Sequence, residues 1–336
     1  MSDPAGAVEG DFTITPLPAT TIPGAPAPLL LSGGDRVPSS EQAAALRALL
    51  DRHGVLLIRG RSPAGPAEVA RFAETLFPLD PVFETGEHPQ ADQAEAVYRP
   101  VPFDSRQTLM WHHENSFNAV FPRVLMFVCR TPAVTGGATT LVDSRLVYQR
   151  ADAAATSRLH TTGIRYVRLC DENTGRRWQQ LYGTDDSAQA ARAAAAAGEE
   201  LEIHRSTARI VATRPAFRTG AHGTVWFNQL LHWHPAALPD DLRRLVRRGA
   251  VPAFRDCTHG DGTPIGDDLI EHITAISQDV EYPVPWQAGD VLLVNNLVYA
   301  HGRHPYRGTR EHFVRMLGHA RHQHPDAGQR RAEQEG

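Results

Sequence analysis

Apolar residues recur at short, regular intervals over most of the chain, but its two ends lack such a pattern. Residues 1–35 are rich in Pro, Ala, Gly and Thr without a helical period, which predicts an irregular, partly disordered N-terminal arm. Residues 323–336 are polar and predict a disordered tail. No linker interrupts the chain between these ends, so we expect a single domain over residues 36–322.

A helix, a strand and a second helix are predicted at the start of this domain. Ser39 and Gln42 form a capping-box pattern ahead of leucines at helical spacing, so we expect a helix over residues 43–52 that ends at Gly54. The buried strand and the second helix are predicted at residues 55–58 and 66–77. We expect these three elements to pack outside a larger β body.

Short β-type runs separated by Gly and Pro turns dominate from residue 97 onward. We expect strands at residues 124–128, 139–142, 164–169, 210–213, 224–227, 291–298 and 312–317. Many short strands with turns between them are typical of a sandwich, barrel or jelly roll rather than of alternating βαβ units. The Ala-rich stretch within residues 185–202 differs and predicts a helical insertion that covers one face of the β body.

Composition narrows the class of protein. The 336 residues suffice for a substantial core, and a net charge of −4 gives no reason to expect a nucleic-acid partner. No run approaches the ~20 apolar residues of a membrane span. The start of the chain lacks the basic and apolar regions of a secretory signal, so we expect a cytoplasmic protein. Its three scattered cysteines predict neither a disulfide framework nor a zinc site.

The histidines suggest a metal site. His112 and Glu114 form a His-x-Glu pair, which in a strand would point both side chains to the same face. A chain with 17 histidines and 38 acidic residues should contain about two His-x-Asp/Glu pairs by chance. The other two such pairs are His259/Asp261 in a turn-like segment and His324/Asp326 in the polar tail. Only the first pair is flanked by apolar and aromatic residues that would form a strand in a dry site.

A third ligand is expected from a distant strand. His301 follows the apolar run at 291–298, and a histidine at the end of a buried strand is well placed to face a cavity. Two imidazoles and one carboxylate occupy one face of an octahedral metal and leave three positions open. This facial triad suits non-haem Fe(II), which needs open positions for a co-substrate and O₂.

Several sequence blocks in fixed order resemble the Fe(II)- and 2-oxoglutarate-dependent dioxygenases of the taurine dioxygenase superfamily. The closest resemblance is to the branch of clavaminate-synthase-like and syringomycin-biosynthesis-type amino-acid hydroxylases. The blocks are residues 54–60, 112–116, 136–139, 225–229, 260–262, 301–303 and 308–310, within a match over roughly 50–320. The resemblance implies a mainly β fold with flanking helices and a double-stranded β-helix (jelly-roll, cupin-like) core, with His112, Glu114 and His301 on iron.

The resemblance also implies a site for 2-oxoglutarate. Thr139, after a Gly-Gly turn, and either Arg310 or Arg315 would hold its far carboxylate, because an Arg fork binds a carboxylate bidentately. The residues predicted to line the substrate pocket are Asn115, Ser116, Asn228 and Arg303. No catalytic side chain is expected beyond the metal ligands.

The implied reaction is hydroxylation of an unactivated C–H bond by O₂, because Glu114 is the carboxylate that halogenating relatives lack; desaturation and epoxidation stay open. The expected substrate is an amino acid or a derivative of one, free or tethered to a carrier protein, in antibiotic or other natural-product biosynthesis. The alternatives are a catabolic dioxygenase for a small sulfonate or carboxylate, a hydrolase or isomerase with another divalent metal, and a β-barrel binding protein without turnover. The oligomeric state is not predicted.

Overall fold

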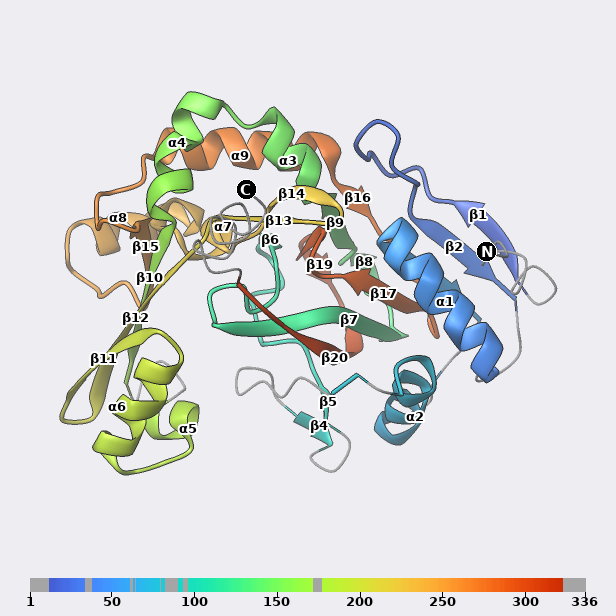
Figure 1. Cartoon of the computed structure of the whole chain (residues 1–336), viewed down its shortest axis with the longest axis horizontal. Helices are drawn as coiled ribbons and strands as arrows, with labels where there is room; N and C mark the ends of the chain where they lie inside the picture. Colours follow the sequence, from blue (N-terminus) through green and yellow to red (C-terminus); the bar gives the residue numbers. More distant parts are fainter. Residues whose placement is uncertain are drawn as a thin grey trace, which may run out of the picture.

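Two β-sheets packed face to face form the centre of the molecule, and helices cover their outer faces (Figure 1). The computed structural model describes residues 12–33, 38–60, 63, 65–78, 80–81, 90–92, 96–171 and 177–322. None of the helices in these ranges is long and apolar enough to span a bilayer.

The major sheet contains eight strands in the order β1-β2-β3-β17-β7-β20-β5-β4. Their bounds, in that order, are Thr13–Pro16, Leu29–Ser32, Val55–Arg59, Val291–Asn295, Val120–Thr131, Glu311–Arg321, Val97–Tyr98 and Gln90–Asp92. The minor sheet has the order β16-β9-β18-β6. Its strands are Tyr282–Pro283, Thr139–Asp143, Tyr299–Arg303 and Leu109–His112.

Further strands extend the ends of this sandwich. A four-stranded sheet has the order β11-β12-β10-β15, with bounds Glu199–His204, Thr207–Arg214, Ile164–Cys170 and Arg255–His259. Two further two-stranded sheets are the hairpin β13-β14 (Phe217–Gly220 and Gly223–Trp226) and the long-range pair β19-β8 (Tyr306–Arg307 and Thr135–Gly136).

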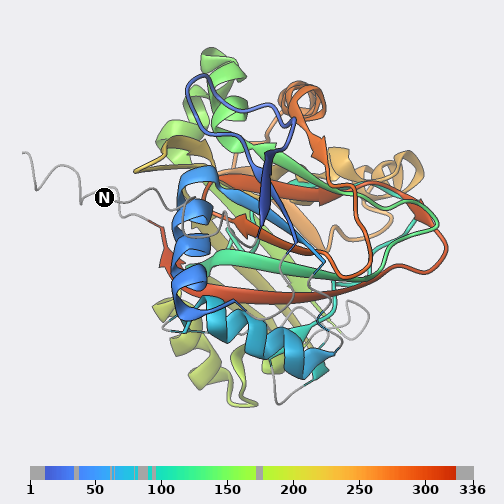
Figure 2. The same ribbon diagram turned by 90° about the vertical axis from the view of Figure 1, so that its right-hand side faces the viewer.

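The helices lie outside the sheets. They are α1 Ser40–His53, α2 Pro66–Leu76, α3 Ser144–Arg150, α4 Ala153–Thr162, α5 Trp178–Tyr182, α6 Ser187–Ala196, α7 Leu230–Trp233, α8 Asp240–Arg247 and α9 Asp267–Val280. A short 3₁₀ helix covers Pro235–Ala237. Figure 2 shows α1 and α2 along the outer face of the major sheet. Helices α3, α7 and α9 pack on the outer face of the minor sheet.

Alternation along β20 explains how one strand serves two cores. Val314 and Met316 face the core between the two sheets, whereas Phe313 and Leu317 face α1 and α2. Successive side chains of a strand point to opposite faces, and both faces of this strand are covered by protein. The predicted strand at 312–317 is therefore confirmed, and its even-numbered residues face the interior.

The predicted first helix is confirmed with its capping box and its terminating glycine, although it begins at Ser40 and not at residue 43. Ser39 and Gln42 form the reciprocal capping box, and Gly54 ends α1 in the left-handed region at φ 76°. The strand that follows, β3, is not outside the β body as predicted. It pairs with β2 and β17 inside the major sheet. Its first four residues are apolar, which suits a central strand because both faces of this sheet are covered.

Replacing Gly54 with Ala is expected to destabilise the fold more than the same change at Gly60. Both glycines have positive φ, so each substitution costs ~1–2 kcal/mol of backbone strain. A Cβ at Gly54 would also lie 2.4 Å from Cε2 of the Tyr299 ring, while at Gly60 it meets open space. Urea unfolding of both variants measures the difference in the free energy of unfolding. Equal losses would show that the Tyr299 ring moves aside without an energetic cost.

The N-terminal segment is more ordered than predicted. Within the predicted arm at 1–35, β1 and β2 form the edge of the major sheet, and β2 runs parallel to β3 with Leu29 and Leu31 buried. The reason is the apolar run at 29–31, which a Pro-rich and Gly-rich context made easy to overlook. Residues 1–11 and the predicted tail at 323–336 lie outside the described residues.

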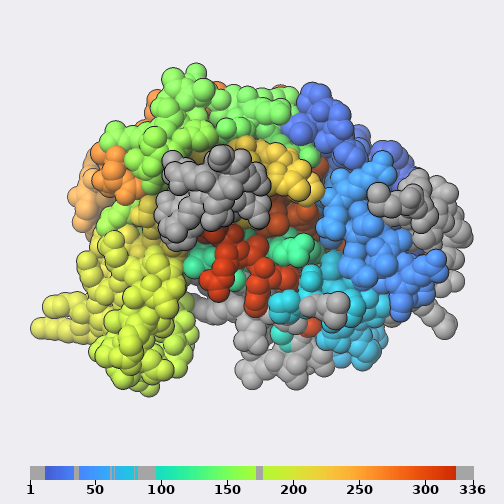
Figure 3. Space-filling model, viewed as in Figure 1, coloured from blue at the N-terminus to red at the C-terminus, as the bar shows by residue number. Residues whose placement is uncertain are grey.

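The Ala-rich segment near 185–202 is a helix followed by a strand. Helix α6 is confirmed, but its continuation is the edge strand β11. Ala190 and Ala194 pack with Trp178 in a small core of their own. This lobe of α5, α6 and β11 protrudes at the lower left of Figure 3 and does not cover the central sheets.

Candidate metal centre

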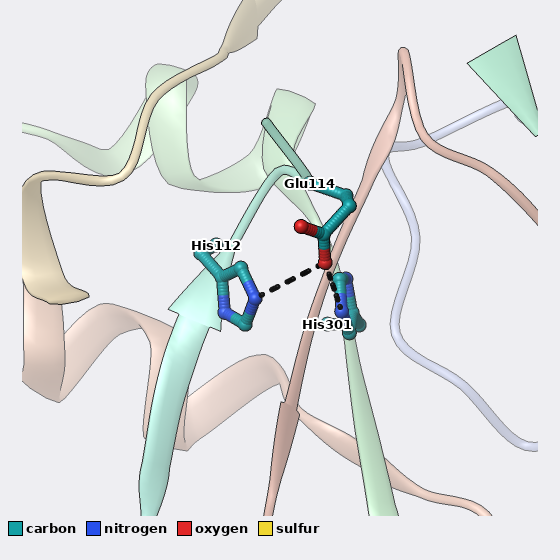
Figure 4. A group of neighbouring side chains, drawn as sticks. All are labelled: His112, Glu114 and His301. Atoms are coloured by element: carbon teal, nitrogen blue, oxygen red, sulfur yellow. Dashed lines mark ion pairs between the residues drawn. The ribbon is translucent and has the colours of Figure 1, made fainter. Parts of the chain in front are cut away.

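Three side chains converge between the sheets as a metal site requires (Figure 4). Oε2 of Glu114 lies 3.7 Å from Nε2 of His112 and 3.6 Å from Nε2 of His301. One ligand atom from each residue lies within 4.8 Å of the others, and all three residues are buried. Atoms that share a metal at ~2.1 Å lie roughly 3–3.6 Å apart, so the two distances from Glu114 are at or just beyond this range and a small contraction brings the ligands onto a divalent ion.

Sheet pairing positions two of the ligands, and a turn positions the third. His301 on β18 is the register partner of His112 on β6. Glu114 lies in the turn after β6 and not in the strand as predicted, so strand alternation does not align it with His112. The backbone reverses at Asn115, whose φ of 56° is in the left-handed region. The predicted strand at 291–298 ends at residue 295, and His301 lies in the middle of the next strand.

Hydrogen bonds select the metal-binding nitrogen of the first histidine. Nδ1 of His112 lies 2.8 Å from the carbonyl oxygen of Met110, which can only accept, so Nδ1 carries the proton and donates. The Nε2 lone pair is then free for a metal, as is usual for metal-binding histidines.

The adjacent histidine has a structural role. His113 is fully buried; its Nδ1 donates to the carbonyl of Asn296 at 2.6 Å, and its Nε2 accepts from the Ser144 hydroxyl at 2.8 Å. Burial lowers the pKa of His113 to about 3. It therefore stays neutral and fixes the segment between the two ligands of the His-x-Glu pair.

Asn296 holds the backbone of the carboxylate ligand, a role that the sequence analysis missed. Its side-chain Oδ1 accepts from the backbone N–H of Glu114 at 2.8 Å, and its Nδ2 donates to the carbonyls of Glu114 and Pro122. The residue is completely buried. The only sequence signal was a polar pair, Asn295-Asn296, interrupting an apolar run.

Replacing Asn296 with Ala is expected to weaken metal binding by about tenfold to a hundredfold, the usual effect of losing a group that orients a ligand. The variant frees the turn that carries Glu114 and leaves its N–H unsatisfied. Competition with a chelating dye measures the affinity, and circular dichroism of the metal-free protein checks folding. A folded variant with unchanged metal affinity would show that the turn carrying Glu114 keeps its conformation without Asn296.

A cavity of about 950 Å³ opens onto the triad. Its wall includes the three ligands, and it extends to Thr139 and Arg310 on one side and to His232 and Arg255 on the other. Its volume lies at the upper end of the ~300–1,000 Å³ typical of small-molecule sites. The cavity therefore has room for more than one small ligand beside a metal.

Thr139 and Arg310 form a polar corner of this cavity. Arg310 donates through Nη2 to Thr139 Oγ1 at 3.2 Å and through Nε to the Gly137 carbonyl at 3.0 Å. The indole N–H of Trp286 donates to the same threonine oxygen at 3.1 Å. Because this hydroxyl accepts two hydrogen bonds, its own proton is directed to a further acceptor.

The guanidinium of Arg310 keeps its charge in this corner. Burial, together with the nearby charge of Arg303, lowers the pKa of Arg310 to about 10, which is still well above neutral. Its hydrogen-bond acceptors among the described residues are neutral. A buried cation without a carboxylate partner, next to a hydroxyl that can donate, fits an anionic carboxylate.

The structure separates the two arginine candidates. Arg315 is an odd-numbered residue of β20, on the outer face with Phe313 and Leu317, and it does not line the cavity. Its Nη2 is 3.3 Å from Oε1 of Glu74 on α2. The prediction that Arg315 competes for the co-substrate is wrong, because strand alternation turns it away from the metal.

Three of the four residues predicted for the substrate pocket do not line this cavity. Asn115 and Ser116 are buried beside the metal ligands, outside the cavity wall. Asn228 is also buried, where its side chain donates to the Ala216 carbonyl and accepts from the N–H of Leu230. Asn115 and Ser116 lie in the turn after β6, which directs their side chains into the protein, and the side chain of Asn228 is held by its own hydrogen bonds to backbone groups.

Arg303 lines the cavity, and its contact with the substrate stays a prediction. Its Nη2 donates to the backbone carbonyls of Asp104 and Gln107, and its guanidinium lies 4.8 Å from the centre of the Tyr306 ring. It therefore holds the 104–107 segment against β18 and adds positive charge to the cavity.

His232 and Arg255 form the opposite end of the cavity and carried no motif in the sequence. The ring of His232 stacks on that of His112, with centroids 5.0 Å apart and planes inclined by 21°. Nη1 of Arg255 donates to Nε2 of His232 at 3.0 Å. Burial holds the pKa of His232 well below its usual range, so this ring is neutral and accepts the bond.

No second metal cluster is found in the ranges that the structure describes. Asp261 lies in a turn and forms an ion pair with Arg158 at 2.7 Å, and the pair His259/Asp261 is not part of a metal cluster among the described residues. His324 and Asp326 lie outside the described residues.

Comparison with known proteins identifies the family. The profile of the "Taurine catabolism dioxygenase TauD, TfdA family" matches residues 15–317, which is most of the chain. This protein belongs to that family. The TauD/TfdA assignment and the buried His-x-Glu and His triad make it an Fe(II)- and 2-oxoglutarate-dependent dioxygenase.

Relatives of this TauD/TfdA protein include two curated proteins at modest identity. The dapdiamide synthesis protein DdaC of Enterobacter agglomerans is 27% identical over 274 residues, covering 80% of this chain and 83% of that protein. A clavaminate synthase-like protein of Arabidopsis thaliana is 28% identical over 275 residues, covering 78% of this chain and 80% of that protein.

Solved structures confirm the predicted double-stranded β-helix fold. PvcB of Pseudomonas aeruginosa matches with a TM-score of 0.55 and 17% identity, covering 94% of both chains. A taurine dioxygenase of Burkholderia xenovorans matches with a TM-score of 0.54 and 16% identity, again covering 94% of both chains. At such identities the likeness concerns the fold alone.

Proposed function

We propose that this protein hydroxylates an unactivated C–H bond of an amino acid or amino-acid derivative, free or tethered to a carrier protein, in natural-product biosynthesis. The observation that carries the oxygenase part is the convergence of His112, Glu114 and His301 on a cavity that also contains Arg310. The hydrogen-bond acceptors of Arg310 among the described residues are neutral. The dapdiamide synthesis protein among the relatives supports the biosynthetic part.

The triad would hold Fe(II) from one side. Two neutral imidazoles and one carboxylate leave the metal a net positive charge and open positions facing the cavity. Bound Fe(II) with 2-oxoglutarate and O₂ would supply the oxidation of the C–H bond, with release of succinate and CO₂. The chain's own contribution is to fix the positions of both ligands and to exclude water.

Thr139 and Arg310 would anchor the far carboxylate of 2-oxoglutarate. They lie on the side of β9, whereas His232 lies beyond β6 at the other edge of the minor sheet. His301 on β18 lies between these two strands. A co-substrate in the Thr139 corner therefore leaves the His232 end of the cavity for the substrate.

The walls of this substrate end combine polar and apolar groups. Arg255 and His232 are its polar groups, and Leu242 and Val246 of α8 contribute apolar surface. Leu242 and Phe254 are among the more exposed large apolar side chains of the described chain. We infer that the substrate offers an acceptor or acidic group near the metal and apolar atoms toward α8.

Succinate release tests this function. The Fe(II)-loaded protein is given 2-oxoglutarate and O₂ with a panel of free amino acids, the same acyl groups as pantetheine thioesters, and small sulfonates. We expect an amino-acid compound to stimulate succinate release and to gain one oxygen atom by mass spectrometry. Stimulation by sulfonates alone would instead support the catabolic alternative, and Zn(II)-dependent turnover without O₂ would support a hydrolase.

A further inference from the structure

His312 is a buried histidine that the metal site does not use. It lies on β20 with 4% of its surface exposed, two residues after Arg310, and lines the same cavity. Neither ring nitrogen has a hydrogen-bond partner among the described residues. Nearly all buried polar groups in proteins are hydrogen-bonded, so an imidazole N–H without an acceptor in a residue of the cavity wall indicates a ligand that accepts it.

The surroundings of His312 define what that ligand offers. Its ring meets Trp286 edge-on, with centroids 4.8 Å apart and planes inclined by 74°. Trp286 donates to the Thr139 hydroxyl, which also accepts from Arg310. The imidazole therefore borders the polar corner that holds a positive charge and a free hydroxyl proton.

The protonation state of His312 also fits a donor. Burial and the charge of Arg310 keep the pKa of His312 well below its usual range. A neutral imidazole carries one N–H, which can donate to an anionic oxygen. It adds no positive charge, so Arg310 supplies the positive charge of this corner. Ordinary core packing would satisfy the ring face but would leave that N–H unpaired.

We propose that His312 is a third protein group on the far carboxylate of 2-oxoglutarate, beside Arg310 and Thr139, and that it makes the enzyme selective for a dicarboxylic co-substrate. The inference rests on the proposed co-substrate corner and adds a positioning and specificity residue to it. An Arg fork and a threonine hydroxyl leave room on the two carboxylate oxygens for a further donor.

The test compares two ligands that share the metal-chelating end. Calorimetry on the Mn(II)-loaded protein measures the affinities of 2-oxoglutarate and of 2-oxobutanoate, which lacks the far carboxylate. In His312→Phe, which keeps a ring against Trp286, we expect 2-oxoglutarate to bind about tenfold or more weakly, the usual effect of losing a hydrogen bond to a charged group. Binding of 2-oxobutanoate should change less than twofold, and His312→Gln should recover part of the loss.

The possible outcomes distinguish a failure of the His312 proposal from a failure of the co-substrate corner at Thr139 and Arg310. Unchanged 2-oxoglutarate affinity in a folded His312→Phe variant, or equal losses for both ligands, would overturn the proposal. If wild-type protein does not prefer 2-oxoglutarate over 2-oxobutanoate, the co-substrate corner itself is wrong. Should the Phe variant not fold, ¹⁵N-histidine NMR of the Zn(II)-loaded wild type decides: a His312 N–H signal that shifts only with 2-oxoglutarate supports the proposal, and no shift overturns it.

Discussion

The variant Glu114→Ala is expected to lose tight metal binding and, with it, succinate release. Glu114 supplies the oxygen ligand and the negative charge between two imidazoles at 3.6 and 3.7 Å. Changes in groups that merely orient a ligand cost about tenfold to a hundredfold in affinity, so we expect removal of the ligand itself to cost more than ~100-fold. Metal competition and succinate assays measure the two effects.

The control for this prediction is Glu271→Ala, which removes an exposed carboxylate on α9. It should retain the metal affinity and turnover of the wild type. Full succinate release by Glu114→Ala at the same metal concentration would contradict the triad and move the metal elsewhere.

The second large effect is expected for Arg310→Gln. The substitution removes the buried positive charge of the Thr139 corner, and loss of a buried charged partner typically costs ~2–5 kcal/mol, or about thirtyfold to several thousandfold in affinity. We expect the apparent KM for 2-oxoglutarate to rise by about a hundredfold, while metal affinity stays near that of the wild type.

Arg315→Gln is the matched control, because it removes a guanidinium only five residues further along the chain, on β20. Arg315 contacts Glu74 on the outer face of the major sheet, so its loss should reduce stability without changing 2-oxoglutarate binding. The reverse pattern, with a large KM effect for Arg315 and none for Arg310, would contradict the assignment of the corner.

The architecture was predictable because each strand leaves a local pattern. Apolar runs between Gly and Pro turns placed β3, β9 and β10 within one residue of their observed bounds and located the middle of the longer strands β7, β12 and β20. The capping box at Ser39 and Gln42 was recognised, but the helix was predicted to begin at residue 43, whereas α1 begins at Ser40. The edge strands β1 and β2 were missed, because an apolar run of three leucines within a Pro-rich arm gains its structure only from pairing with β3.

Residues of the site could be predicted from the sequence only where they belong to a recognisable motif. The His-x-Glu pair and His301 were found, but the reason given for their alignment was wrong, because a left-handed turn at Asn115 positions Glu114. The choice between Arg310 and Arg315 required knowing which face of the sheet each side chain points to. A register shift between residues 311 and 312 interrupts the alternation of faces between these two arginines.

Groups that act through tertiary contacts left little or no local signal. Asn296 reaches Glu114 across 182 positions in the sequence, and His232 stacks on His112 from a short helix. His312 looked like any strand histidine until both of its nitrogens were found without partners. Such residues are visible only when the fold is known.

The most direct test of the central claim is an anaerobic titration of the Fe(II)-loaded protein with 2-oxoglutarate, followed by visible absorption. A chelate of ferrous iron and the 2-oxo acid gives a metal-to-ligand charge-transfer band. We predict that this band saturates at one equivalent in the wild type and is absent in His301→Ala. No band in the wild type, or the same band in that variant, would contradict an iron and 2-oxoglutarate site at these three residues.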